Sequence, residues 1–513
     1  MQKKIIYLLF SLLLSIEILL SYNIGNIDNY PENFINNFHF NSTFFIKAMI
    51  LTIPIYLLLK IALLLINQIR INKTSINNNK SFLLLVFISL TITNLIFLIT
   101  YFPGSNMNDT LYIINNPIAY STQHPIFYNL ILSIPFKIFY KITSNINISF
   151  FIISFIQILI MNAIITYIIY WINKSIHNKN LTILTFLYFL LLPIVSNYNS
   201  VLIKDSLFSG LLLLHIPIIY NIINNNKSNN KYIFIILLLT VLIRNNGLYI
   251  VIFEAIVLSL YTKKNFFIKS LVLIIIINSI PNLILNNKQL FQEKIAIPIQ
   301  QISYVTKYKE NTIANKDKQY LNKIMKINDI KNHYNPYNVD TIKWNSNFNR
   351  QYLDKTKKDF LILWVKLLKN NKEEYIKSYL LETYHLWSIN EFKTTQSRFL
   401  GIDKSDYNET TFNMLENKRV FPKSIHNKLK TYYEKTTIFF NNGTCIWILL
   451  FLLTIIINKK KYKYILLFLP FIGLYLTLLI SAPISYAFRY MSPILYSLPI
   501  LIIVTLKINK KSI

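Results

Sequence analysis

The chain of 513 residues carries 53 Lys or Arg against 22 Asp or Glu, a formal charge of +31, while 53% of its residues are hydrophobic. This apolar content excludes an ordinary soluble basic protein, and because only six of the basic residues are arginines in a sequence rich in Asn, Ile and Lys, the charge alone does not indicate nucleic-acid binding. Seven widely spaced glycines exclude a glycine-rich phosphate loop, and the single cysteine, Cys445, excludes an intrachain disulfide or a cysteine metal cluster.

Long apolar stretches with charges at their ends recur along the chain, which is typical of a polytopic helical membrane protein. We predict an all-α fold of about twelve spans in three parts: an N-terminal transmembrane bundle (1–285), a mainly helical external domain (286–440) and a C-terminal three-helix segment (441–513). The spans are predicted near residues 5–21, 44–66, 82–100, 148–172, 181–196, 206–222, 232–243, 247–261, 268–285, 444–457, 464–481 and 490–506.

The orientation of the spans follows from short basic connectors, because loops rich in Lys and Arg stay in the cytoplasm. Such connectors lie at the start of the chain, at 67–81, 173–180, 262–267 and 458–463, and at its end. Both termini are therefore predicted to be cytoplasmic, with an external loop at 101–147. A crossing at 126–142 would turn the basic connectors at 173–180 and 262–267 to the outside. We therefore expect this segment to be a juxtamembrane helix that lies flat on the outer face, interrupted by Pro135 and Lys137.

The segment 286–440 is far too long for a connecting loop, so we predict an external domain there. Apolar and charged residues alternate at helical spacing in two parts of it, which predicts amphipathic helices at 360–368 and 375–387.

Carboxylates are scarce outside this domain. Residues 1–285 contain only Glu17, Asp28, Glu32, Asp109, Asp205 and Glu254, and residues 435–513 contain none. Glu17 and Glu254 fall within spans, where a carboxylate usually pairs or is protonated. Asp205 follows Lys204 at a predicted helix start, so we expect a cap or an ion pair there. Asp109 stands out by its position, as a lone carboxylate in an external loop.

Arg244 and Arg489 lie at external helix ends, where positive-inside topology does not place cations. In a chain that otherwise uses lysine, a planar guanidinium suggests a bound phosphate or carboxylate. Lys204 is predicted on the same face. The alternative is that each arginine only reaches lipid headgroups. His124 is a candidate ligand, or an interfacial residue.

Several of these residues stand in short motifs that together resemble a family of bacterial multispanning proteins of unknown function. The motifs are Tyr101-Phe-Pro-Gly-Ser with Asn108-Asp109, His124-Pro-Ile-Phe-Tyr, Lys204-Asp-Ser-Leu-Phe, Arg244-Asn-Asn-Gly-Leu-Tyr, Ile297-Pro-Ile-Gln-Gln, Trp364 with Trp387, and Phe488-Arg-Tyr-Met-Ser-Pro. That family is similar to the GT-C glycosyltransferases, which include protein O-mannosyltransferases and the aminoarabinose transferases acting on lipid A. The motifs add Asn245, Gln300 and Tyr490 to the site candidates.

The resemblance implies a GT-C helical bundle in the bacterial cytoplasmic membrane, with its active site on the outer face. The donor would be a sugar on a polyprenyl phosphate or diphosphate, transferred with inversion to an envelope glycan, lipid or protein. Carried over to this chain, Asp109 would be the general base, and Lys204, Arg244 and Arg489 would bind the lipid phosphate. Better-known members often have paired acids in this loop. Asp109 has no acidic neighbour, so no cofactor is predicted and a divalent metal is disfavoured.

Two other functions fit the same pattern. A transporter or lipid flippase also has many spans, and the short broken pair of apolar segments around Arg244 suits one. A transporter should carry charged groups or proton relays near the middle of the membrane, and it rarely needs a large external domain. A glycan polymerase or ligase of the O-antigen type would share the external arginines.

Overall fold

The computed structural model describes residues 2–25, 30–69, 74, 76, 80–104, 108–118, 124–224, 230–285, 290–390, 420–437, 440–481, 484–485 and 487–509. Helices make up the regular structure of these ranges, which hold one isolated bridge between Thr74 and Asn178 and no strand. The predicted all-α class is confirmed.

Nine helices within the described ranges are long and apolar enough to cross a membrane. They are α1 (Gln2–Ile24), α3 (Ser42–Gln68), α4 (Lys80–Thr100), α7 (Ile146–Ile176), α10 (Lys204–Ile223), α12 (Asn245–Thr262), α13 (Phe266–Leu285), η3 with α26 (Tyr462–Phe468 and Leu469–Ser481) and α27 (Ser492–Asn509). The predicted multi-pass membrane character is thereby supported by the length and apolar content of the helices.

The other three predicted spans fall on shorter elements. Helices α8 (Lys179–Leu191) and α9 (Pro193–Ser200) are bent by 58° against each other, and α11 (Asn230–Ile243) and α25 (Asn442–Asn458) have fewer than 18 residues. The exact number of crossings therefore stays a prediction.

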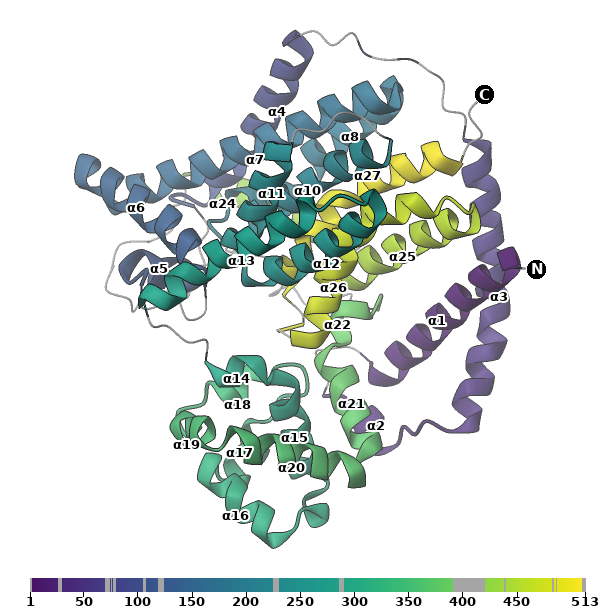
Figure 1. Ribbon diagram of the computed structural model, residues 1–513, viewed down its shortest axis with the longest axis vertical. Helices are drawn as coiled ribbons and strands as arrows, with labels where there is room; N and C mark the ends of the chain where they lie inside the picture. Colours follow the sequence, from purple (N-terminus) through teal and green to yellow (C-terminus); the bar gives the residue numbers. More distant parts are fainter. Residues whose placement is uncertain are drawn as a thin grey trace.

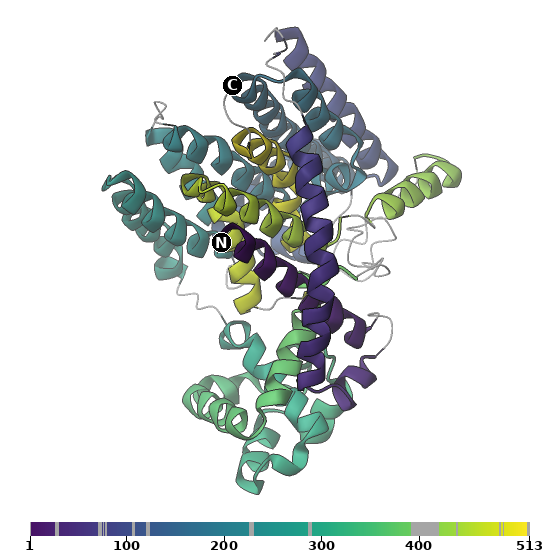
Figure 2. The same cartoon turned by 90° about the vertical axis from the view of Figure 1, so that its right-hand side faces the viewer.

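The bundle has enclosed spans at its centre and apolar, exposed spans at its periphery. Among these nine helices α10 is the most enclosed, with 78% of its most apolar 18-residue stretch buried, whereas only 17% of the corresponding stretch of α3 is buried. A helix that is apolar on all sides and still exposed has to face lipid, so α3 and the similarly exposed α13 are peripheral. In both views α3 extends alongside the bundle and the domain next to it (Figures 1 and 2).

Residues 126–142 form a helix, as predicted. It is α6 (Ile126–Thr143), which contains Pro135 and packs against α5 (Asn108–Asn115), α7 and α11. It is not one of the nine helices that qualify as spans. Its flat position on the membrane stays a prediction.

Residues 290–390 fold into a separate helical domain at one end of the bundle (Figure 1). Its core includes Ile302, Leu321 and Phe360. Its elements are α14 (Phe291–Lys294), α15 (Ala296–Tyr308), η2 (Glu310–Thr312), α16 (Asn315–Ile324), α17 (Ile327–His333), α18 (Asp340–Lys343), α19 (Arg350–Lys355), α20 (Lys357–Asn370), α21 (Lys372–Glu382) and α22 (Tyr384–Trp387).

The two predicted amphipathic helices are present in this domain. Phe360, Leu363 and Leu367 form the buried face of α20 at helical spacing. The second prediction, 375–387, is divided between α21 and α22, which are separated at Thr383.

Contacts with other parts of the chain hold the domain in place. Lys377 Nζ donates to the Ile35 carbonyl at 3.2 Å, from α21 to α2 (Glu32–Asn36), and Tyr384 Oη donates to the Gly25 carbonyl at 3.0 Å, just after α1. Farther along, α24 (Lys423–Thr437) packs on α9 of the bundle. The predicted segment 286–440 thus consists, where it is described, of the domain at 290–390 and a helix on the bundle.

Candidate functional site

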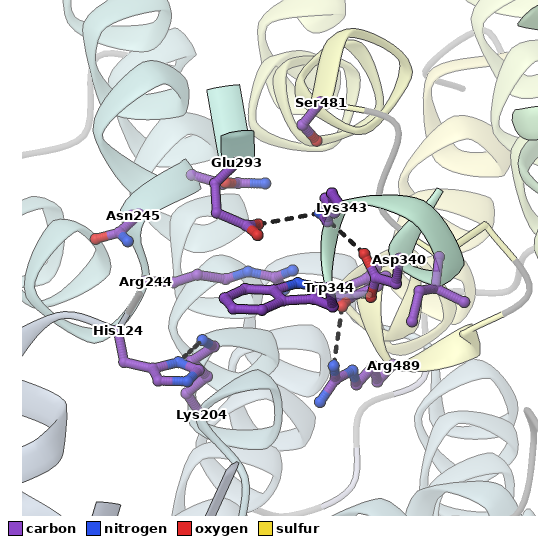
Figure 3. Close-up of a pocket in the computed structure, with 13 residues that line it drawn as sticks. His124, Lys204, Arg244, Asn245, Glu293, Asp340, Lys343, Trp344, Ser481 and Arg489 are labelled. Atoms are coloured by element: carbon purple, nitrogen blue, oxygen red, sulfur yellow. Dashed lines mark hydrogen bonds and ion pairs between the residues drawn. The ribbon is translucent and has the colours of Figure 1, made fainter. Parts of the chain in front are cut away.

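A cavity of about 320 Å³ lies where the bundle meets the domain (Figure 3). The bundle side is formed by residues at helix ends: His124, Lys204, Arg244, Asn245, Asn246, Ser481, Ile484, Arg489 and Tyr490. The domain side is formed by Glu293 of α14, by Asp340 and Lys343 of α18, and by Trp344.

Two span N-termini open on this cavity. Lys204 is the first residue of α10, and Arg244 is the N-cap of α12 in an extended conformation, with φ −147° and ψ 134°. Asn245 and Asn246 follow in the first turn of α12. Because a helix N-terminus carries unpaired N–H groups and a partial positive charge, both helices favour an anion at this point.

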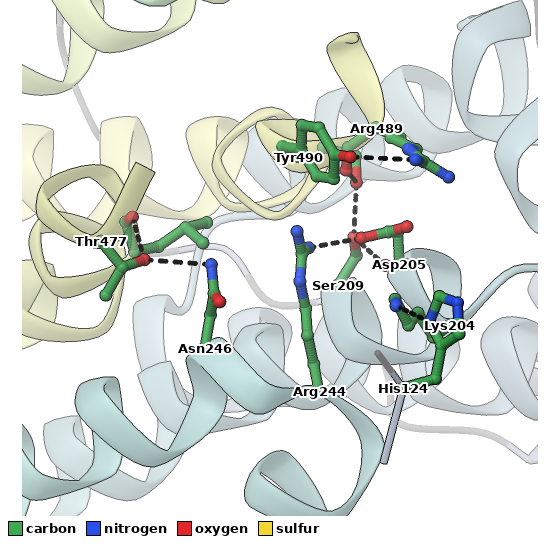
Figure 4. A network of polar contacts seen from close by, with 11 residues as sticks. His124, Lys204, Asp205, Ser209, Arg244, Asn246, Thr477, Arg489 and Tyr490 are labelled. Atoms are coloured by element: carbon green, nitrogen blue, oxygen red, sulfur yellow. Dashed lines mark hydrogen bonds and ion pairs between the residues drawn. The ribbon is translucent and has the colours of Figure 1, made fainter. Parts of the chain in front are cut away.

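Arg244 is fixed from several sides (Figure 4). It forms an ion pair with Asp205, and both side chains are buried. Its guanidinium lies between two aromatic rings, 5.2 Å from the centre of Phe208 and 5.1 Å from that of Tyr490. A side chain held in this way is not simply reaching toward lipid headgroups. The ion pair of Asp205 is not with its neighbour Lys204, as the sequence suggests, but with Arg244 from another helix, because packing of α10 against the start of α12 brings these two side chains together.

The other two predicted cations are also attached to site candidates. The Lys204 ammonium donates to His124 Nδ1. Arg489 belongs to η4 (Phe488–Tyr490), and its Nη2 donates to Tyr490 Oη at 2.9 Å. A hydrogen bond of 2.9 Å between Ser209 and Ser492 joins α10 to α27 beside them (Figure 4). The three cations therefore occupy fixed positions.

The domain side has its own charge cluster. Lys343 Nζ lies 2.9 Å from Asp340 Oδ1 and 3.2 Å from Glu293 Oε2. Burial lowers the pKa of Lys343, but the two carboxylates outweigh burial and raise the pKa above its ordinary value, so the lysine stays charged. Trp344 follows, with the Arg350 guanidinium 4.9 Å from the centre of its ring system.

Four cationic side chains and two carboxylates line the cavity, and Asp205, the partner of Arg244, adds a third carboxylate beside it, so the cations still exceed the carboxylates by one. Together with the two helix N-termini, this balance favours an anionic ligand. Within the described part of the chain, no three His, Cys, Asp or Glu side chains come together as a metal site requires.

Six of the predicted site residues line this one cavity although they come from four separate parts of the sequence: His124, Lys204, Arg244, Asn245, Arg489 and Tyr490. Gln300 lies elsewhere, since it is buried in the domain and its Nε2 donates to the Asn335 carbonyl at 2.7 Å. Trp364 also has a role inside the domain, where its Nε1 donates to Gln301 at 2.7 Å.

Asp109 lies in the first turn of α5, and its side chain is outside the described part of the structure. The next residue, Thr110, donates to the Leu202 carbonyl at 2.5 Å. Thr110 also lines a small adjoining cavity of about 10 Å³ together with His124, Lys204 and Arg489. The start of α5 therefore lies beside the site, while the role of Asp109 stays a prediction.

Sequence reasoning missed the domain side: Glu293, Asp340, Lys343 and Trp344. They come from two four-residue helices and the residue after one of them, in a region rich in Lys, Asp and Glu. The one usable signal was Trp344, since the chain has only five tryptophans.

The fold and the cavity define a multi-pass helical membrane protein with a helical domain at one end and an anion-attracting cavity at the junction. The model of DUF6020, a family of unknown function, matches residues 112–513, and the chain belongs to that family. No curated protein and no solved structure matches the chain.

Proposed function

We propose that the protein is a GT-C-type glycosyltransferase, which moves a sugar from a polyprenyl phosphate or diphosphate to an envelope glycan, lipid or protein on the outer face of the bacterial cytoplasmic membrane. One observation carries this proposal. Lys204, Arg244 and Arg489 are far apart in the sequence, and all three line one cavity at the end of the bundle.

These cations suit a departing lipid phosphate. When the bond between the anomeric carbon and the phosphate oxygen breaks, the phosphate leaves with the electron pair and gains negative charge. Cations that are already in place stabilise this charge without reorganisation. The ion pair with Asp205 and the rings of Phe208 and Tyr490 give Arg244 such a fixed position.

Helix α6 supplies a path for the lipid tail. His124, just before α6, lines the cavity, and Ile131, Ile134 and Ile138 are exposed along one side of the helix. This apolar strip leads away from the polar cavity, as a polyprenyl chain bound by its phosphate requires.

Asp109 is the general base in this proposal. Its carboxylate accepts the proton of the acceptor hydroxyl while that oxygen bonds to the anomeric carbon, a contribution that typically amounts to about 10²- to 10⁴-fold in rate. The position of α5 beside the cavity supports this assignment.

The direct test is binding of undecaprenyl phosphate to the purified protein in nanodiscs. Loss of a charge-assisted hydrogen bond costs about 1.5–3 kcal/mol, so Arg489→Ala should weaken binding by about 10- to 150-fold. Lys428→Ala is the matched control, because Lys428 is exposed on α24. Asp109→Asn should keep phosphate binding and lose sugar transfer from the lipid extract of the producing cells. Equal affinities of Arg489→Ala and the wild type would contradict the phosphate site.

A transporter or flippase is the second candidate, because one buried pair lies within the spans. His215 Nδ1 lies 2.7 Å from Glu254 Oε2, His215 Nε2 lies 3.0 Å from Thr240 Oγ1, and His215 and Glu254 are buried. Ionisable residues inside a bundle often mark proton pathways. The test is whether a pH gradient drives a fluorescent polyprenyl phosphate across the membrane of liposomes that contain the protein. Such movement, if it is lost in Glu254→Gln, would favour this function.

A further inference from the structure

We propose that the domain side of the cavity, Glu293, Asp340, Lys343 and Trp344, binds the sugar ring of the donor, opposite the cations that hold its phosphate. This inference rests on the proposed function, since it assigns the second half of the same ligand. It places the choice of sugar in the external domain and the binding of the lipid phosphate in the bundle.

The polarity of the cavity indicates which part of the donor enters it. Among the thirteen residues that line it, Ile484 is the one aliphatic side chain. A polyprenyl tail would displace water from these charged and amide groups without offering hydrogen bonds in return, and such desolvation of polar groups is costly. A polar head group offers hydrogen bonds in place of that water, and about 320 Å³ lies in the size range of small-molecule sites.

Trp344 provides a flat surface for a sugar ring. Its side chain projects into the cavity (Figure 3) and it is 37% exposed. A sugar ring carries hydroxyls around its edge and C–H bonds on its face. Because the face of an indole is negative, it attracts such slightly positive C–H groups. The Arg350 guanidinium, 4.9 Å from the ring centre, holds the indole in position.

Glu293 provides an acceptor for a sugar hydroxyl. Its Oε2 accepts from Lys343 at 3.2 Å, while its Oε1 is buried and accepts no hydrogen bond from any described residue. Buried carboxylate oxygens are normally hydrogen-bonded. The Glu293 side chain lines the cavity and is 25% exposed, so its carboxylate can accept a hydrogen bond from a ring hydroxyl there.

Lys343 explains how two carboxylates can lie in the same cavity as a phosphate. Its ammonium bridges Asp340 and Glu293 at 2.9 and 3.2 Å. The cluster therefore offers carboxylate acceptors to hydroxyls while its net negative charge is reduced, which limits the repulsion of a phosphate bound to Arg244 and Arg489.

The experiment compares glycosylated with bare polyprenyl phosphates as ligands of one protein. Wild type and variants in nanodiscs are incubated with the lipid extract of the producing cells, and mass spectrometry measures how much of each form is retained. The wild type should enrich the glycosylated form about 10-fold over the bare one. Trp344→Ala should reduce that enrichment to near one and leave retention of the bare form unchanged, and Glu293→Gln should reduce it several-fold.

Trp344→Phe is the matched control, because it keeps an aromatic face and should keep most of the enrichment. Each variant is compared with the wild type by its thermal unfolding midpoint. Equal retention of both forms by the wild type, or full enrichment in Trp344→Ala, overturns the sugar site and leaves the phosphate site standing. A wild type that retains neither form overturns both proposals.

Discussion

The ion pair between Asp205 and Arg244 provides a quantitative test of the geometry of the cavity. In Arg244→Gln the carboxylate of Asp205, which is fully buried, loses its compensating charge. Breaking a buried pair from one side costs about 3–5 kcal/mol. The cation–π contacts with Phe208 and Tyr490 are lost as well, which adds up to about 2 kcal/mol when such contacts are desolvated.

A double-mutant cycle separates the pair from the rest of this cost. Asp205→Asn alone leaves a buried guanidinium without its partner, whereas the double variant with Arg244→Gln leaves two neutral groups that can hydrogen-bond. We expect the double variant to be more stable than the sum of the single losses by about 1.5–3 kcal/mol.

The assay is equilibrium unfolding in mild detergent, followed by tryptophan fluorescence. If the losses of unfolding free energy in the two single variants add up to the loss in the double variant within about 0.5 kcal/mol, the two side chains do not interact. The position described for Arg244 would then be wrong. Arg244→Lys serves as control, because it keeps the charge and loses the planar fork.

Two further predictions concern the domain and its junction with the bundle. Burial raises the pKa of Glu382 to about 8 from an ordinary 4.5, with Lys343 lowering it and Asp340 raising it. Between pH 4.5 and about 8 the folded chain then holds one more proton than the unfolded chain, so the domain should lose stability as pH rises through this range. Unfolding midpoints measured against pH should show this fall, and Glu382→Gln should make it smaller. A Cβ at Gly443 would lie 1.9 Å from the Ser388 carbonyl oxygen, so Gly443→Ala should cost about 1–3 kcal/mol or more. Gly473→Ala, where the nearest atoms lie 3.6–3.7 Å away, should be close to neutral, and equal unfolding midpoints for the two variants would refute the close approach.

The bundle side of the cavity was predictable because its signal is local. Apolar runs mark the spans, and an arginine at the end of a span is conspicuous in a chain that uses lysine elsewhere. Arg244 and Arg489 are such residues, and both line the cavity.

The partners of these residues were harder to predict, because they are set by packing between distant segments. Asp205 is next to Lys204 in the sequence, yet it pairs with Arg244 from another helix, while Lys204 contacts His124. The domain side depends on how α14 and α18 dock onto the bundle, and no periodicity in two four-residue helices encodes that.

The deeper buried pair, His215 with Glu254, has an explanation that needs no proton transport. Helices α10 and α12 both begin at the cavity, and each pair joins the two: Asp205 with Arg244 at the mouth, and His215 with Glu254 ten positions further along both helices (205 to 215 and 244 to 254). The two pairs lie about 15 Å apart along each helix at 1.5 Å per residue. Together they prevent one helix from sliding past the other.

Buried pairs of this kind stabilise a fold weakly but can fix the arrangement of its parts. The pair of His215 and Glu254 would then act together with the pair of Asp205 and Arg244 to keep Lys204 and Arg244 level with each other at the proposed phosphate site. Replacing His215 and Glu254 together by leucine and methionine should preserve the fold, since apolar residues of similar volume often substitute for a buried pair, and it should retain undecaprenyl phosphate binding, since Asp205 and Arg244 still join the two helices at the cavity. Replacing either residue alone should lower both the stability of the fold and the affinity for undecaprenyl phosphate, because it leaves the other polar side chain buried without this partner. If the double replacement abolished phosphate binding in a protein of unchanged stability, the pair would act on the ligand and this structural role would be refuted.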